Sequence, residues 1–158
     1  MAGEQPGKRV TINAAFLQEI KEDHQHLKEL LEQLRTLTEV PQVLSNHGQQ
    51  FVNLLGSLCD QLAFHFTLEE AYGYFEEALD SKPHLESQAG LLKGQHAELF
   101  VLARDLADAA AQLDFSSDSK AEKIARRFRV FDQALRDHES AELNLILAAL
   151  EDDLGVGD

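Results

Sequence analysis

The chain has 158 residues, the length of one domain, and its 44% hydrophobic and 27% charged residues are ordinary values for a soluble globular protein. The formal net charge is -14, which argues against nucleic acid and anionic membrane surfaces as partners because both would repel the chain. No apolar run approaches the ~20 residues that span a bilayer, and Cys59, the single cysteine, excludes an intramolecular disulfide and a multi-cysteine metal site.

The first predicted element is a long amphipathic helix. Residues 1–12 lack the hydrophobic core of a signal peptide, so we expect a flexible N-terminus and a cytoplasmic protein. After them, apolar residues recur at three- and four-residue steps, which is the spacing of one helix face. Asn13 is a good N-cap and Pro41 disfavours helix just before it, so the helix is predicted from about Asn13 to about Thr38.

Two further helices follow in chain order. The second is predicted to begin between Pro41 and Gln49 and to end near Ser81, ahead of the next proline. The third is predicted from about Pro83 to about Leu113, because the missing N–H of proline costs nothing in the first turn of a helix. No segment alternates apolar and polar residues for long, as a strand would.

The fourth helix has the clearest predicted start. Ser119 and Glu122 fit a Ser-x-x-Glu capping box, and the helix is expected to end near Leu150. Four long helices with short connections favour an all-α, antiparallel up-down-up-down four-helix bundle. We therefore predict one bundle domain over residues 13–151, followed by a flexible tail over residues 152–158.

The inward face of each predicted helix is an apolar stripe with one polar interruption. A single histidine in such a stripe is usually a hydrogen-bonded core residue, but here the interruptions recur on every helix. In an up-down bundle they lie at similar depths from one end, within about a helical turn at ~1.5 Å per residue. They are, in chain order, His24, His65 with Glu69, His96, and His138 with Glu142.

This convergence of four imidazoles and two carboxylates indicates a metal site. Two ionised carboxylates buried without partners would cost more than a domain of this size can lose. Imidazole and carboxylate groups around a compensating cation are the donors of a transition-metal site. One metal rarely takes six such side chains, whereas two metals with two histidines each and two shared glutamates use all six. The histidine spacings of 41 and 42 residues repeat, and each second histidine has a glutamate four residues later, on the same helix face.

Four fragments around these residues resemble a known family, the hemerythrin/HHE cation-binding domain. Each fragment is short, but their order and their places on the helix stripes are similar to the family over nearly the whole chain. The resemblance implies a hemerythrin-like bundle with two iron ions per chain, joined by an oxo or hydroxo bridge. The fragments are DHQHL at residues 23–27, HFTLEE at 65–70, QHAEL at 95–99 and HESAE at 138–142.

The same resemblance implies how two metals divide the ligands. Manganese or zinc could take the place of iron at the same side chains. The ferritin-like di-iron family needs Glu-x-x-His on two helices, and no glutamate stands three residues before any of these four histidines. The implied division gives His24 and His65 to one iron and His96 and His138 to the other, with Glu69 and Glu142 as bridges.

One position departs from the oxygen-carrying members of the family. They have a fifth histidine one turn after the ligand of the third helix, where this chain has Phe100. We therefore expect a protein that binds or senses a small ligand such as O2, NO, peroxide or azide, and reversible oxygen carriage is disfavoured. The alternatives are a di-iron enzyme that decomposes peroxide, an iron-buffering protein and a bundle without metal. The sequence does not indicate a dedicated catalytic residue or an oligomeric state.

His26 is the rival of His24 for the ligand position on the first helix. It shares a helix face with Asp23, Leu30 and Gln33, which lie off the predicted apolar stripe. His24 continues the stripe itself. We therefore favour His24 as the ligand.

Three further residues could supply hydrogen bonds or extra ligands to the centre. Tyr72 continues the stripe beyond the second-helix glutamate, and Glu70 and Glu139 stand directly beside predicted ligands. Each has an ordinary alternative, as a core aromatic ring or an exposed carboxylate. Cys59 is interpreted as a small buried hydrophobic residue rather than a redox thiol.

Overall fold

The structure is a computed structural model that describes residues 4–71 and 83–157. In these ranges the chain forms five helices and no strand, which confirms the predicted all-α fold. No helix in the described ranges has both the length and the apolar character needed to cross a bilayer. The helices are α1 (Glu4–Thr38), α2 (Pro41–Asn46), α3 (Gly48–Ala71), α5 (Pro83–Ala111) and α6 (Asp118–Gly157).

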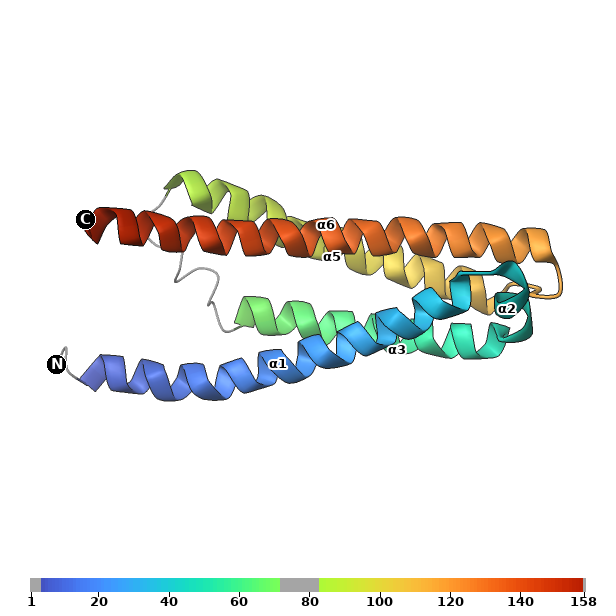
Figure 1. Ribbon diagram of the computed structural model, residues 1–158, viewed down its shortest axis with the longest axis horizontal. Helices are drawn as coiled ribbons and strands as arrows, with labels where there is room; N and C mark the ends of the chain where they lie inside the picture. Colours follow the sequence, from blue (N-terminus) through green and yellow to red (C-terminus); the bar gives the residue numbers. More distant parts are fainter. Residues whose placement is uncertain (1–3, 72–82, 158) are drawn as a thin grey trace.

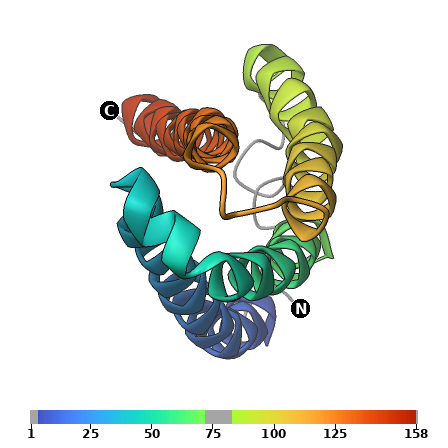
Figure 2. The ribbon, with the colours of Figure 1, turned by 90° about the vertical axis from the view of Figure 1, so that its right-hand side faces the viewer.

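Of the helices in the described residues, the long ones α1, α3, α5 and α6 lie around one axis, and the short helix α2 lies at one end (Figures 1 and 2). In Figure 1, α1 and α5 run from left to right, and α3 and α6 run in the opposite direction. Figure 2 looks along the bundle and shows α1, α3, α5 and α6 following one another around it. Each of these helices packs on the next, and α2 packs on both α1 and α6.

Two predicted helix ends are wrong. α1 begins at Glu4 rather than near Asn13, and α6 ends at Gly157 rather than near Leu150. Pro6 lies in the first turn of α1, where a proline is tolerated, so the helix can start well before Asn13. α6 contains no proline that would stop it earlier. The predicted third helix agrees with α5 to within two residues at each end.

The predicted second helix is divided near His47 into α2 and α3. α2 has Pro41 in its first turn, and α3 begins at Gly48, inside the range predicted for a helix start. A Cβ atom at Gly48 would lie 2.5 Å from the ring of Phe115, so glycine is required under that ring. The predicted end near Ser81 lies outside the described residues.

The cap of α6 is two residues away from the predicted one. The backbone N–H of Lys120 donates to Oγ of Ser117 at 3.4 Å, so Ser117 is the capping residue and Ser119 lies inside the helix. Glu122 forms an ion pair with Arg129 at 3.0 Å instead of completing a capping box. The predicted capping box of Ser119 and Glu122 is therefore wrong.

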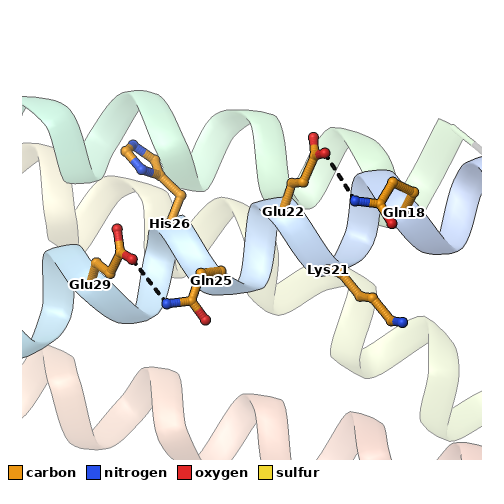
Figure 3. A pocket seen from close by; sticks show the side chains of 6 residues that line it. All are labelled: Gln18, Lys21, Glu22, Gln25, His26 and Glu29. Atoms are coloured by element: carbon orange, nitrogen blue, oxygen red, sulfur yellow. Dashed lines mark hydrogen bonds between the residues drawn. The ribbon is translucent and has the colours of Figure 1, made fainter.

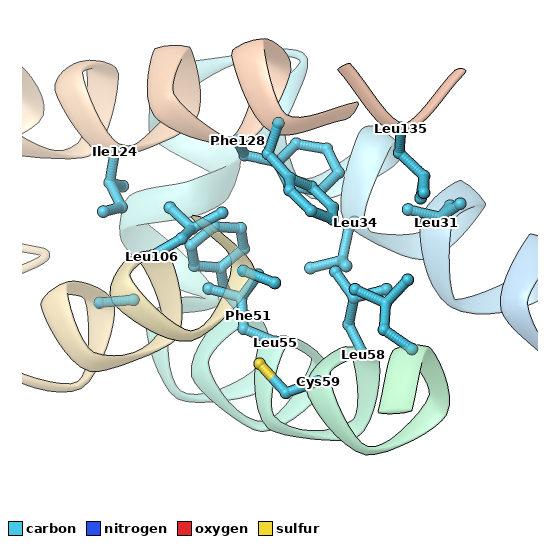
Figure 4. Packing of buried hydrophobic residues seen from close by; sticks show 14 of the residues in the cluster. Leu31, Leu34, Phe51, Leu55, Leu58, Cys59, Leu106, Ile124, Phe128 and Leu135 are labelled. Atoms are coloured by element: carbon cyan, nitrogen blue, oxygen red, sulfur yellow. The ribbon is translucent and has the colours of Figure 1, made fainter. Parts of the chain in front are cut away.

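Among the described residues, two apolar clusters fill the bundle interior. The larger lies toward the α2 end, takes residues from all five described helices, and includes Phe51 and Phe128, whose rings meet edge to face at 6.4 Å (Figure 4). Each large apolar side chain that is fully buried contributes roughly 1.5–3 kcal/mol. The smaller cluster consists of Leu85, Leu92, Leu145 and Ala149 on α5 and α6. Between the two clusters, the buried residues of α6 include His138 and Glu142. The bundle therefore has a polar layer with apolar packing on both sides.

A bidentate ion pair connects α1 with α6. Nε and Nη2 of Arg35 donate to the two carboxylate oxygens of Asp132 at 2.9 and 2.7 Å. Asp132 is buried, and its hydrogen bonds raise the pKa of Arg35 above its ordinary value. This pair fixes α1 against α6 beside the larger apolar cluster, which includes Leu34 and Phe131.

Candidate metal centre

The predicted ligands lie in the polar layer and come from four helices. Regular i to i+4 spacing brings each histidine–glutamate pair together, because such residues stack on one helix face. Nε2 of His65 lies 2.7 Å from Glu69, and Nε2 of His138 lies 2.7 Å from Glu142. Five of the six predicted side chains are buried, with exposed fractions of 8% or less, and only His24 is exposed.

Four buried residues, Glu69, His96, His138 and Glu142, form one group in the layer. Each contributes one donor atom, and these atoms lie within 4.8 Å of one another. Nε2 of His96 lies 3.0 Å from Glu69 Oε2 and 3.9 Å from Glu142 Oε2. Buried polar atoms nearly always have a hydrogen-bond partner, but four in this group have none. They are Glu69 Oε2, His96 Nε2, His138 Nε2 and Glu142 Oε1.

This donor set fits a transition-metal cation. Imidazole nitrogens and carboxylate oxygens that face one another at short range have lone pairs to donate, and a cation would satisfy all of them at once. The chemistry of the donors is also that of iron sites with histidine and carboxylate ligands. The residues present therefore fit the metal that their sequence pattern predicts.

His65 lies beside this group and is surrounded by carboxylates. Its Nδ1–H donates to Asp23 Oδ2 at 2.5 Å, and its Nε2 lies 2.8 Å from Glu139 Oε1 as well as close to Glu69. Gln61 donates to the other oxygen of Asp23 at 2.6 Å. His65, Glu69 and Glu139 form a second group, in which one donor atom of each residue lies within 4.8 Å of the other two.

The expectation that His24 points inward is wrong, although His24 does lie next to His65. Asp23 takes the buried position instead, with 3% of its surface exposed, while His24 is exposed. Neighbouring helix positions differ by about 100°, and Asp23 lies on the same face as the buried Leu27 and Leu30. The ring centroids of His24 and His65 are 5.4 Å apart, and donor atoms of Asp23, His24 and His65 lie within 4.8 Å of one another.

His26 lies away from the cluster, as expected when His24 was favoured over it. It is exposed and lines a shallow surface groove along α1 (Figure 3). In that groove, Gln18 donates to Glu22 at 3.1 Å and Gln25 donates to Glu29 at 2.9 Å. Such i to i+4 pairs are ordinary features of an exposed helix face. The groove carries no feature of a metal site.

The outer nitrogen of each buried histidine has a hydrogen-bond partner. Nδ1–H of His138 donates to Gln95 Oε1 at 2.8 Å, and Nδ1–H of His96 donates to Glu70 Oε2 at 3.1 Å. The ring of Phe66 stacks on His96 with centroids 4.2 Å apart and planes 8° apart. Such partners hold the proton on Nδ1 and direct the Nε2 lone pair toward the centre, as in histidine ligands of metalloproteins.

The carboxylates around His65 change its affinity for a proton. Burial alone would lower the pKa of His65, because desolvation disfavours the imidazolium ion. Contacts with Asp23, Glu139 and Glu69 outweigh burial and raise that pKa to about 12. In the absence of metal, a protonated His65 thus supplies the positive charge that these carboxylates need.

The other ligands show the same competition between burial and neighbouring charge. Burial and the neighbouring Glu69 raise the pKa of Glu142 to about 10. Burial opposes ionisation of Glu69 too, but contacts with two histidines hold its pKa well below the usual range. Burial lowers the pKa of His138. Burial also lowers the pKa of His96, but contacts with Glu69 and Glu70 outweigh burial and raise that pKa above its ordinary value. Glu69 is therefore ionised and Glu142 is protonated when no metal compensates them.

Several residues of the centre were not expected from the sequence. Asp23 had a usable signal, since an acidic residue four positions before Leu27 stands on a face that is otherwise apolar. Gln95 and Gln61 had none, because a glutamine beside a histidine is common on exposed helix faces. Glu70 and Glu139, which the sequence left open between extra ligands and ordinary exposed carboxylates, both contact histidines. Tyr72 lies outside the described residues.

Comparison with known proteins agrees with the site. The model of one family, the hemerythrin HHE cation-binding domain, matches residues 15–150, a range that includes all six predicted ligands. No curated protein and no solved structure matches the sequence. Since the family match covers most of the chain, the protein belongs to the hemerythrin HHE cation-binding domain family.

Proposed function

We propose that this protein holds two iron ions in the polar layer of its bundle and that the centre binds or senses a small ligand. One observation carries the proposal, namely the four buried donor atoms that face one another without hydrogen bonds. Membership of a cation-binding family supports it. The proposed ligands are His24, His65, Glu69, His96, His138 and Glu142.

The position of Glu69 supports a bridge between two metals. Its Oε1 lies 2.7 Å from Nε2 of His65, and its Oε2 lies 3.0 Å from Nε2 of His96. The two oxygens thus face histidines on different helices. A carboxylate placed in this way can give one oxygen to each metal.

The proposed division of ligands follows from this bridge. His24 and His65 belong to one metal, and His96 and His138 belong to the other. Glu142 is the second shared ligand, with Oε1 2.7 Å from His138 and Oε2 3.9 Å from His96. Both Glu142 distances involve the same proposed metal, so Glu69 is the better supported bridge of the two.

Bound iron would supply open coordination positions and exchangeable electrons for O2, NO or peroxide. The side chains around the centre determine which molecules reach these open coordination positions. Phe66, Leu92, Leu99, Leu135 and Leu145 lie near the ligands along their helices and are buried. Apolar packing beside the ligands favours small molecules such as O2, NO and peroxide, and probes such as azide. Peroxide decomposition would use the same position and is the enzymatic alternative.

Iron buffering is a second candidate, and one observation favours it. His24 is exposed to solvent, whereas the other five proposed ligands are buried. A metal with one exposed ligand can exchange more easily than a fully enclosed one. Rapid loss of one of two irons to a mild chelator would favour buffering over ligand sensing.

The proposed function is tested by metal analysis and optical spectroscopy of protein produced in iron-replete medium. We expect two irons per chain and an absorption band that azide, NO or peroxide changes. Consumption of peroxide over many turnovers would select the enzymatic alternative. Protein that takes up no metal, or only one per chain, would overturn the two-iron proposal.

A further inference from the structure

Two carboxylates converge on one ring nitrogen of His65. Nε2 of His65 lies 2.7 Å from Glu69 Oε1 and 2.8 Å from Glu139 Oε1. The other nitrogen, Nδ1, is already used by Asp23. Nε2 of a protonated His65 has one N–H, which forms a hydrogen bond with Glu139, so Glu69 and Glu139 must share one hydrogen. Donors of this kind gather where a cation binds between them.

Glu139 differs in this respect from Glu70, the other glutamate beside a proposed ligand. Glu70 meets His96 at Nδ1, the nitrogen that faces away from the centre, at 3.1 Å. Glu139 meets His65 at Nε2, the nitrogen that faces the centre. The side chain of Glu139 is 35% exposed and that of Glu70 is 41% exposed, so the two glutamates do not differ in exposure. They differ in the histidine nitrogen that each one contacts.

We propose that Glu139 is an additional carboxylate ligand of the metal held by His24 and His65. This inference rests on the proposed function and deepens it. One metal then has five protein ligands, including the two shared glutamates, and the metal held by His96 and His138 has four. The two metals are therefore unequal, and the metal with four ligands offers more room for a small molecule.

The charges around the two proposed metals also differ. On the His65 side, the outer partner of the histidine is the carboxylate of Asp23, and Glu139 adds a second negative charge. The outer partner of His138 is the uncharged amide of Gln95. The His65 side thus carries more negative charge and favours the more highly charged cation.

The test is a titration of the metal-free full-length chain with Co2+, followed by visible absorption. Glu139→Gln keeps the shape of the side chain and removes its charge, and Glu70→Gln is the matched control. Wild type should bind two Co2+. Glu139→Gln should bind its first Co2+ with an affinity within about threefold of wild type. It should bind its second Co2+ at least roughly tenfold more weakly than wild type does. Its second Co2+ should also absorb more strongly, as expected for fewer ligands, whereas Glu70→Gln should keep two sites and both spectra.

The outcomes separate this inference from the proposed function. If Glu139→Gln binds two Co2+ with wild-type affinities and wild-type spectra, Glu139 is not a ligand, although the two-metal centre stands. If Glu70→Gln weakens the second site as much as Glu139→Gln, the effect is one of general charge and the inference is overturned. If wild type binds fewer than two Co2+, the proposed function and this inference fail together. Circular dichroism of both variants verifies that the bundle is folded.

Discussion

Asp23 and His65, on different helices, share a hydrogen bond of 2.5 Å between His65 Nδ1 and Asp23 Oδ2. Gln61 donates to the other oxygen of Asp23 at 2.6 Å. These two contacts explain how an acidic side chain remains buried in the bundle, where an unpaired charge would be very unfavourable. They also fix the orientation of the His65 ring, so that its Nε2 faces Glu69 and Glu139.

The first prediction concerns this positioning. Asp23→Asn should weaken metal binding by about ten- to a hundredfold, because an amide holds the ring less firmly and removes a negative charge near the metal. Calorimetric titration of the metal-free variant with a divalent cation measures the change. Asp60→Asn, an exposed position on α3, is the control and should bind like wild type. Equal affinities for Asp23→Asn and wild type would show that the hydrogen bond is structural only.

The second prediction concerns the shared ligand. Glu69→Ala should lose both metals rather than one, since the two oxygens of Glu69 face His65 and His96 separately. Metal content per folded chain, from elemental analysis and circular dichroism, is the measurement. Glu98→Ala removes an exposed glutamate of α5 and should keep both metals. A Glu69→Ala protein with one tightly bound metal per chain would contradict the bridge.

The third prediction concerns Phe100, which stands one turn after His96 and packs against the larger apolar cluster. Phe100→His should add a ligand to the His96 side and fill the position where a small molecule would bind. Azide binding and reaction with peroxide, followed by absorption, should therefore both decrease. Val101→His, at an exposed neighbouring position, should leave both unchanged. An unchanged reaction in a Phe100→His protein whose new histidine is ligated would refute the idea.

Helical periodicity predicted the buried part of the centre well. His65, Glu69, His96, His138 and Glu142 interrupt apolar stripes, and a side chain on a stripe must enter the core once the helices pack. Because the helices pack side by side, these five buried side chains lie at one level of the bundle. Their pairing also follows from helix geometry, because an i to i+4 step leaves histidine and glutamate in contact.

The same periodicity was less informative where the apolar face is wide. On α1, Leu27, Leu30 and Leu31 are all buried, so the stripe does not decide between Asp23 and His24. Contacts with α3 decide it, because His65 can satisfy a buried carboxylate. Hydrogen-bond partners on other helices, such as Gln95 for His138, depend on helix rotation that the sequence does not define.

The last prediction concerns pH and distinguishes protein with metal from protein without it. In the metal-free chain the pKa of His65 is raised from 6.5 to about 12, and that of Glu142 is raised from 4.5 to about 10. Both groups therefore keep protons in the folded state that the unfolded chain releases. Stability linked to a raised pKa is complete below the unfolded value and is lost as pH rises toward the folded value. The lowered pKa values of His138 and Glu69 change the stability only below about pH 6.5. They therefore do not offset the loss of stability in alkaline solution.

The melting temperature of chelator-treated protein should thus fall as pH rises from 7 to 8.5. Metal-loaded protein should change little over that range, because coordination has already removed the protons, and should lose stability below about pH 6 as protons compete for the ligands. Thermal melts with and without chelator measure both trends. Glu142→Gln replaces the titrating carboxyl group with a neutral amide, so its metal-free form should show a shallower fall than wild type. A metal-free melting temperature that rises with pH between 7 and 8.5 would mean that His65 and Glu142 do not hold these protons, and the charge balance derived for the centre would be wrong.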